Sequence, residues 1–174
     1  MRRAVRTFSM WPDAGGRFRP SHTLRRAELA SAMLAGARVP QFMPAFPNFT
    51  DLSDATTMSF VESAQTRPGG ALFPDAPRGG PFRPDEGVTR LLAAIVLVRA
   101  AGLEAETALP GASALPGVTD AGSIPFAWRG HVSVARAHGL LSSEAQFNPN
   151  GAFTRADLAR ALAVIAELQT REDE

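Results

Sequence analysis

Apolar residues recur at helical spacing in several segments of the chain. The clearest segment is 154–169, whose apolar stripe is separated by polar residues. Side chains three and four positions apart share one face of an α-helix, so this spacing predicts a helix. The stripe consists of Leu158, Ala161, Leu162, Ile165 and Leu168. The same argument predicts helices over residues 24–37, 54–65, 89–101 and 127–138, and the end of a first short helix over residues 2–11.

The helix predicted over residues 89–101 is apolar on most of its sides, which indicates that it is buried. The segments between the helices are rich in proline and glycine. We expect residues 38–50 to form an extended connector, residues 67–87 a surface insertion and residues 102–117 another loop. Because only short extended pieces remain, the pattern predicts an all-α fold.

One sequence pattern occurs three times and organises the chain. It reads FRPSHTLRR over residues 18–26, FRPDEGVTR over residues 82–90 and FNPNGAFTR over residues 147–155. Each copy has Phe, any residue, Pro, five residues and then Arg, and the copies recur after 64 and then 65 residues. A fixed internal spacing at a nearly constant period indicates a repeated structural unit.

Each copy has the chemistry of a turn followed by a helix start. The proline fixes its own φ and favours extended geometry in the residue before it. Thr89 and Thr154 lie where an N-cap is expected, as does Asp54 ahead of another helix. Thr154 with Asp157 is close to a capping box. An arginine always follows in the first helical turn, where the helix dipole disfavours a cation, so we expect it to meet a specific carboxylate or an anionic ligand.

These features together resemble the S-layer homology domain. The resemblance lies in Phe49-Thr50-Asp51 and Val118-Thr119-Asp120, which stand where two units begin, and in the arginine-bearing segments that follow. Those segments are Arg25-Arg26-Ala27-Glu28, Thr89-Arg90-Leu91-Leu92 and Thr154-Arg155-Ala156-Asp157. The likeness covers the chain from about Arg2 to Leu168.

The resemblance implies three tandem helix-loop-helix repeats in a pseudo-threefold arrangement around a central helix bundle. The repeats span residues 1–47, 48–109 and 115–170. The first repeat lacks the Phe-Thr-Asp start, so we expect it to be truncated and the chain to be the C-terminal piece of something larger. Grooves between neighbouring repeats are the ligand sites of this family.

The resemblance also implies which residues bind. In this family the grooves bind cell-wall carbohydrate, often a polymer bearing pyruvate ketals, whose carboxylate suits a bidentate arginine. By position, the ligand-binding residues are Arg26, Arg90, Arg155, Trp128, Asp51, Asp120, Glu28 and Asp157. Two alternatives stay open: the arginines pair internally with Asp51 or Asp120, and Trp128 packs in the core instead of forming a platform under a sugar. Trp11 has a similar position to Trp128.

At some positions the sequence departs from the family pattern, and we expect ligand binding in the affected grooves to be weaker. The second copy has Leu91-Leu92 where the family has Ala-Glu, and the first has Arg25 where it has Thr. Grooves altered in this way can lose their ligand and leave the array as a structural appendage.

Composition narrows the classes of function. The net charge of +1 gives no electrostatic footprint for nucleic acid, and all 18 basic residues are arginine. The chain has no cysteine, which excludes disulfides and thiolate chemistry. No apolar run approaches the roughly 18 residues of a membrane span. The basic start, Met1 to Arg6, lacks an apolar core, so we expect any signal peptide to lie upstream and the chain to act outside the cell, at its surface or in its wall.

Catalytic patterns are missing from the sequence. It contains no G-x-S-x-G, P-loop or G-x-G-x-x-G motif, so we expect neither an enzyme nor a cofactor. His131 and His138 share a helix face, either as metal ligands or as partly exposed helix residues, and His22 lies in a turn. Two interpretations remain: a noncatalytic anchoring module that binds anionic wall polysaccharide, or an accessory domain of a larger secreted enzyme such as a subtilisin-like serine protease.

Overall fold

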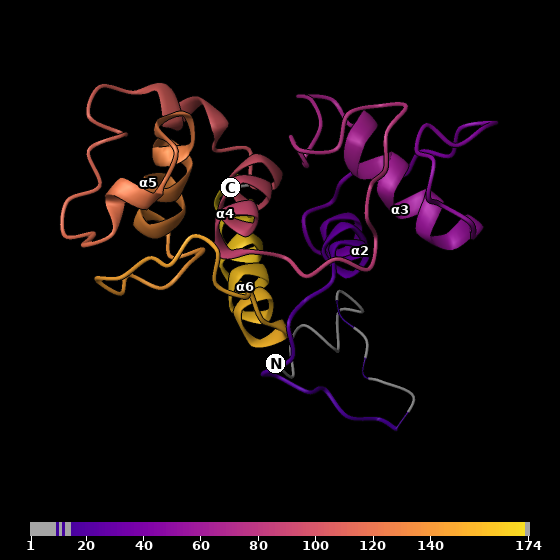
Figure 1. Ribbon diagram of the computed structural model, residues 1–174, viewed down its shortest axis with the longest axis horizontal. Coiled ribbons are helices and arrows are strands. Elements are labelled where there is room, and N and C mark those ends of the chain that lie inside the picture. The colour runs from indigo at the N-terminus through magenta and orange to yellow at the C-terminus, as the bar shows by residue number, and fades with distance from the viewer. Residues whose placement is uncertain (1–9, 11, 13–14, 173–174) are drawn as a thin grey trace.

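The chain is mostly helical in the computed structural model, which describes residues 10, 12 and 15–172 (Figure 1). Within these residues there are five α-helices and no β-strand. The all-α class expected from the sequence is therefore confirmed. The helix predicted over residues 2–11 lies outside the described residues apart from Met10, and so does Trp11.

The five α-helices begin and end within a few residues of the predicted bounds. They are α2 (Arg26–Gly36), α3 (Ala55–Thr66), α4 (Arg90–Ala100), α5 (Arg129–Ala137) and α6 (Arg155–Glu172). Three short 3-10 helices lie between α4 and α5: η1 (Glu104–Ala108), η2 (Ala121–Ser123) and η3 (Phe126–Trp128). The start of the helix predicted at residue 127 thus belongs to η3.

The predicted caps are confirmed. The Thr89 hydroxyl accepts a hydrogen bond from the first turn of α4, and Asp54 Oδ1 accepts the Thr57 N–H at 2.8 Å at the start of α3. At the start of α6, Asp157 Oδ2 accepts the Thr154 N–H at 2.9 Å while Thr154 Oγ1 accepts the Asp157 N–H at 3.3 Å. These bonds satisfy N–H groups that a helix leaves free at its first turn.

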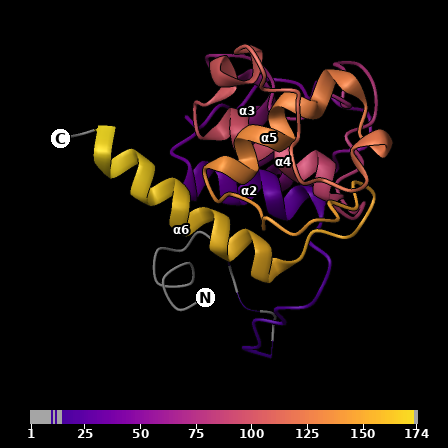
Figure 2. The same cartoon turned by 90° about the vertical axis from the view of Figure 1, so that its left-hand side faces the viewer.

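The helices pack in pairs, α2 against α3 and α4 against α5, and α6 also contacts α2 (Figures 1 and 2). The middle of α4 is wholly buried, as its sequence predicted. Its buried residues are Ala93, Ala94, Ile95, Val96, Leu97 and Val98. Figure 2 shows the C-terminal part of α6 extending beyond the other helices.

The apolar residues just before three of the helices join the repeated motifs to one another. The Leu24 N–H donates to the Phe153 carbonyl at 2.8 Å, Phe153 donates to Val88 at 2.9 Å, and Val88 donates back to Leu24 at 2.8 Å. All three side chains are buried. The three motif copies therefore contact one another in a closed cycle.

The prediction of extended geometry before each motif proline is wrong. Arg19, Arg83 and Asn148 have φ values of 48°, 61° and 52°, in the left-handed region. A reason is visible at the second and third copies, where Asp51 and Asp120 each accept two successive N–H groups of the turn. Those bonds outweigh the local preference that proline imposes.

Residues 67–87 are not simply a surface insertion, and that prediction is also wrong. Leu72, Phe73 and Phe82 are almost fully buried. Gln65 in α3 donates to the carbonyl groups of Phe73 at 3.0 Å and of Ala76 at 3.1 Å, and accepts the Phe73 N–H at 2.9 Å. These contacts hold the segment against the core.

Candidate functional site

Each repeated arginine lies against the phenylalanine of another motif copy. Its Nε donates to the phenylalanine carbonyl oxygen, and its guanidinium lies over the same ring. The pairs are Arg26 with Phe82, Arg90 with Phe147 and Arg155 with Phe18, with Nε–O distances of 2.8, 2.7 and 2.8 Å and guanidinium-to-centroid distances of 4.8, 5.3 and 5.1 Å. A cation over an aromatic face is attracted by the ring quadrupole, so this contact stabilises the cycle of motifs.

The backbone positions each arginine for this contact. At the start of α6, the Arg155 N–H donates to the His22 carbonyl at 3.0 Å and the Ala156 N–H donates to the Pro20 carbonyl at 2.9 Å. The N-termini of α2 and α4 make the equivalent bonds to the second and third motif copies. The loop of one copy thereby satisfies the free N–H groups of another copy's helix.

The two terminal nitrogens of Arg26, on the outer edge of the guanidinium, pair with a carboxylate of the same chain. Its Nη1 and Nη2 lie 2.8 and 3.2 Å from the two carboxylate oxygens of Asp75. Its side chain is 1% exposed, and the guanidinium lies 5.2 Å from the Phe73 ring centroid as well as over Phe82. Arg26 is therefore a buried structural residue in this arrangement.

Arg90 is half-buried. Its terminal nitrogen contacts a hydroxyl group, whereas the terminal nitrogens of Arg26 contact a carboxylate. Its Nη2 donates to Ser142 Oγ at 3.2 Å. Asp120 lies nearby and accepts the N–H groups of Phe147 and Asn148, each at 2.7 Å. Burial opposes ionisation of Asp120, but these N–H bonds outweigh it and, with the charge of Arg90, lower its pKa below the ordinary value.

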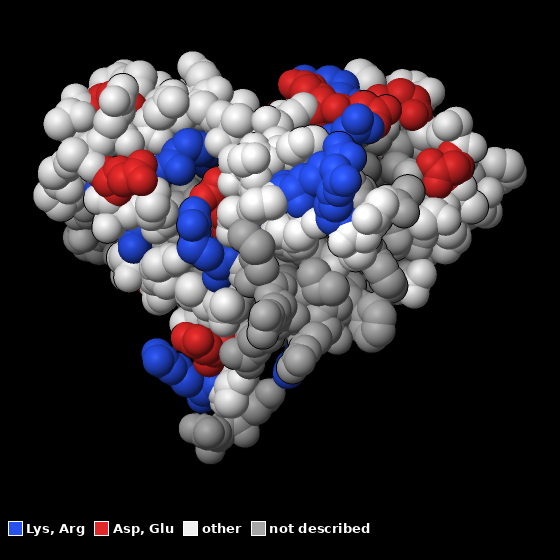
Figure 3. All heavy atoms as spheres, turned by 90° about the horizontal axis from the view of Figure 1, so that it is seen from below, with Lys and Arg blue, Asp and Glu red and all other residues white. Residues whose placement is uncertain are grey.

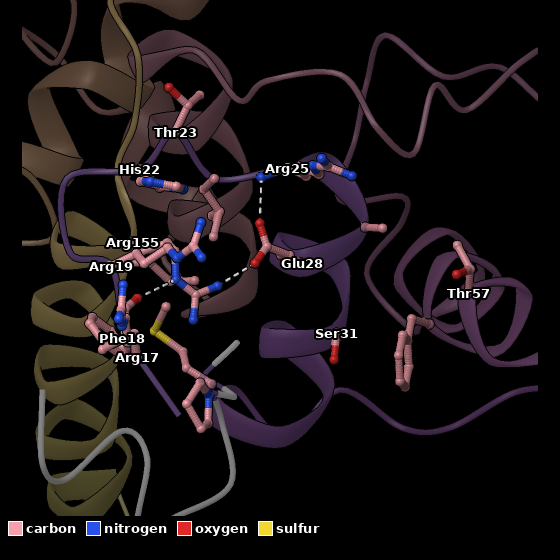
Figure 4. Close-up of a pocket in the computed structure, with 16 residues that line it drawn as sticks. Arg17, Phe18, Arg19, His22, Thr23, Arg25, Glu28, Ser31, Thr57 and Arg155 are labelled. Atoms are coloured by element: carbon pink, nitrogen blue, oxygen red, sulfur yellow. Dashed lines mark hydrogen bonds and ion pairs between the residues drawn. The ribbon is translucent and has the colours of Figure 1, made fainter. Parts of the chain in front are cut away.

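Arg155 forms an ion pair with Glu28 at the N-terminus of α2. The other oxygen of Glu28 accepts the Arg25 N–H at 2.9 Å, so Glu28 caps its own helix while it pairs with α6. The Arg155 side chain is 11% exposed. Figure 4 shows Arg155 and Glu28 pointing toward each other at one side of a pocket.

This pocket has a volume of about 510 Å³ and is lined by the first motif copy and by residues of α2, α3 and α6. Among the described residues, four arginines, one histidine and the carboxylate of Glu28 line it. The basic residues are Arg17, Arg19, Arg25, Arg155 and His22. Phe18 and Phe60 add apolar walls, and Ser31 adds a hydroxyl (Figure 4). The lining therefore suits a ligand that has an anionic group and an apolar face.

The rest of the surface carries charges of both signs. Figure 3 shows acidic and basic side chains next to one another in several places on one face of the molecule. Away from the pocket, for example, Arg83 Nε lies 3.3 Å from Glu86 Oε2 in an exposed pair. The basic lining of the pocket is thus a local feature, in keeping with the net charge of +1.

The remaining carboxylates of the predicted site have structural contacts. Asp51 accepts the N–H groups of Phe82 and Arg83 at 2.8 and 2.7 Å. Asp157 caps α6 and pairs with Arg160. The sequence suggested Asp51 or Asp120 as internal partners of the repeated arginines, but the ion pairs that form involve Asp75 and Glu28.

The predicted aromatic platform lies away from the pocket. Trp128 is half-buried and meets the His131 ring edge-on at 5.1 Å between centroids, with the Arg99 guanidinium 5.7 Å from its own centroid. His138 Nε2 lies 2.8 Å from Glu106 Oε2. The described residues hold no group of three or more side chains suited to a metal ion.

Sequence reasoning missed several residues that the structure brings to these sites. Arg17, Arg19 and Phe60 line the pocket, and Asp75 pairs with the repeated Arg26. The only signal for Asp75 was its position in a segment that also contains Leu72 and Phe73, two large apolar residues among prolines and glycines. Pairing across such distances depends on the tertiary arrangement.

Comparisons with known proteins add no family. No protein-family model matches the chain, and no curated protein matches it significantly. None of the helices in the described part of the chain is long and apolar enough to cross a membrane. The fold and the site thus define an all-α protein with a basic pocket beside Arg155.

Proposed function

We propose that the chain is a noncatalytic module that anchors a protein to the cell surface by binding an anionic polysaccharide of the cell wall. The observation that carries this proposal is the pocket of about 510 Å³ beside Arg155, whose lining among the described residues includes four arginines and one carboxylate. Arginine binds carboxylates through two parallel N–H donors, so it suits a sugar acid. Phe18 and Phe60 offer apolar surface to the C–H face of a sugar ring.

The likeness to the S-layer homology domain supports the same proposal. Three motif copies that contact one another in a cycle fit three repeats, over residues 1–47, 48–109 and 115–170, in a pseudo-threefold arrangement. In such an arrangement the pocket lies where the first and third repeats meet, with Thr57 and Phe60 of the second repeat also in its lining. An extracellular location, at the cell surface or in the wall, follows from this function.

In this proposal the residues that line the pocket contact the ligand. Of the three repeated arginines, only Arg155 is among them. Arg26 is buried and paired with Asp75, so its removal would test folding and not binding. Ser31 and Arg25 are better targets, because both line the pocket, and the Arg25 side chain contacts another motif copy only in an exposed pair with Asp85 among the described residues.

The test is sedimentation with purified cell-wall sacculi from the organism that encodes the chain. Ser31→Trp fills the pocket, Arg25→Ser removes one positive charge while keeping a residue suited to the N-cap position, and Arg78→Ser removes an exposed arginine outside the pocket. We expect the wild type and Arg78→Ser to pellet, and the two pocket variants to pellet several-fold less. Equal pelleting by all four folded proteins would contradict the pocket as the site.

One observation favours a second function, that of a structural accessory domain in a larger secreted enzyme such as a subtilisin-like serine protease. All three repeated arginines make internal contacts that hold the motif copies together. If the folded wild type does not pellet with any preparation of these walls, the accessory function is the better explanation.

A further inference from the structure

We propose that Asp75 is an intramolecular ligand, which fills a carboxylate-binding site at Arg26 that a free carboxylate can occupy when the Asp75 side chain is removed. This inference does not depend on the wall-polysaccharide proposal, because Arg26 and Asp75 do not line the pocket beside Arg155. The three repeated arginines make the same contact at Nε, on the inner edge of the guanidinium. At the terminal nitrogens, on its outer edge, their contacts differ.

The inner edge of each arginine donates to a phenylalanine carbonyl, and the outer edge in each case meets an oxygen acceptor. For Arg155 that acceptor is Glu28, two residues after Arg26. The residue two after Arg90, which is positioned to serve Arg26 in the same way, is Leu92, and it has no acceptor. Asp75 supplies the missing carboxylate from outside the repeated motif.

The Arg26 site holds the carboxylate with more than one donor. Arg26 Nη1 and Nη2 lie 2.8 and 3.2 Å from Asp75 Oδ2 and Oδ1, and Arg83 Nη2 lies 2.7 Å from Oδ2. The Phe73 and Phe82 rings meet edge-to-face at 4.9 Å between centroids, and the Arg26 guanidinium lies over both. Because the guanidinium is buried and stacked, it keeps its orientation without Asp75, and a preorganised fork of this kind suits carboxylates in general.

The site is also reachable from solvent. The Asp75 side chain is 43% exposed although that of Arg26 is 1% exposed, so the carboxylate covers the guanidinium from outside. The segment around it is held independently by the burial of Leu72 and Phe73 and by the hydrogen bonds of Gln65. Shortening Asp75 therefore opens a gap the size of a carboxylate above the two guanidinium groups and leaves the segment in place.

Chemical rescue tests this directly on the full chain. Asp75→Ala is melted in sodium formate, in sodium acetate and in sodium chloride of the same ionic strength. We expect the variant to melt below the wild type in chloride, and formate or acetate to raise its Tm by several degrees more than that of the wild type, because a ligand that binds only the folded state stabilises it. Equal shifts in the two proteins would overturn the proposal.

Two further variants distinguish site occupancy from a general salt effect. Asp75→Asn keeps the shape of the side chain, so we expect it to be destabilised and not rescued by formate. Asp85→Ala breaks the exposed pair between Arg25 and Asp85, whose side chains are 62% and 83% exposed, respectively. We expect formate to raise the Tm of this variant no more than that of the wild type. If Asp75→Ala does not fold in chloride, folding must return in formate, and a protein that stays unfolded contradicts the inference.

Discussion

Arg155 Nε donates a hydrogen bond of 2.8 Å to the carbonyl oxygen of Phe18, two residues that are 137 positions apart in the chain. With the matching pairs at Arg26 and Arg90, this contact closes the cycle of motif copies between the start and the end of the described chain. Bringing such distant residues together costs conformational entropy, so the contact depends on the rest of the fold and in turn restrains it.

Removal of the Arg155 side chain tests the closure. Arg155→Ala loses the bond to Phe18 and leaves Glu28 without this partner in a half-buried position, so we expect a loss of about 2–4 kcal/mol in the free energy of unfolding. Arg160→Ala on the same helix is the control, since its side chain is 70% exposed and such pairs contribute below about 1 kcal/mol. Urea denaturation measures both, and similar losses in the two variants would contradict a role for closure.

Acid should destabilise the protein through Asp120 and Asp157. Burial opposes their ionisation, but N–H and O–H donors outweigh it and lower the pKa of both carboxyl groups. The unfolded chain then binds protons at a higher pH than the folded chain, so stability is full above the ordinary aspartate pKa of about 4 and falls as pH drops toward the folded-state values. Denaturation midpoints between pH 7 and pH 3 measure this loss.

Asp120→Asn provides the specific check of that pH dependence. Because the amide cannot accept the Phe147 and Asn148 N–H groups with two charged oxygens, we expect a variant that is less stable at pH 7 and less sensitive to acid below pH 4. Asp85→Asn, in an exposed pair, serves as control. An acid sensitivity of Asp120→Asn equal to that of the wild type would refute the assignment.

His131 should cause a second pH-dependent loss of stability, at higher pH than the loss caused by the aspartates. Neither ring nitrogen has a hydrogen-bond partner among the described residues; burial lowers the pKa of His131, and the charge of Arg99 adds to this while Glu104, with Oε1 4.0 Å from Nε2, opposes it. The unfolded chain therefore takes up the proton first, and stability is lost as pH falls below the ordinary histidine value of about 6.5.

His131→Phe is expected to remove this loss, because phenylalanine keeps a ring against Trp128 and cannot be protonated. Its stability at pH 7.5 should stay within about 1 kcal/mol of the wild type, since no hydrogen bond is broken. Urea midpoints at pH 7.5 and pH 5.5 measure the difference. The same decrease in both proteins would show that His131 does not cause it.

Gly130 should not tolerate a side chain. A Cβ at this position would lie 2.4 Å from the carbonyl oxygen of Thr107, a backbone atom that cannot move without shifting η1. We expect Gly130→Ala to cost about 1–3 kcal/mol through overpacking between α5 and η1. Gly122→Ala is the matched control because its Cβ meets nothing within 4 Å, and thermal melting of both variants measures the difference.

The elements and the repeated motif were accessible from the sequence because their signals are local. The caps at Asp54, Thr89 and Thr154 and the buried α4 depend on residues within one or two turns of one another. The candidate site was accessible only in part. The repeated arginines could be singled out from the motif. Their acceptors and the pocket residues could not, because they come from segments that are distant in the sequence and approach only in the folded chain.

The sequence by itself determined that this chain forms helices at regular intervals, and that three of them, α2, α4 and α6, begin at the arginine of one repeated phenylalanine, proline and arginine motif. Helical spacing and capping are short-range properties, so they can be recognised in one segment at a time. Only the tertiary structure decided that Arg26 meets Asp75 while Arg155 meets Glu28 beside an open pocket. The physical reason is that a guanidinium pairs with the oxygen acceptor that lies next to it in the folded chain. Which acceptor that is depends on the packing of residues that are far away in the sequence.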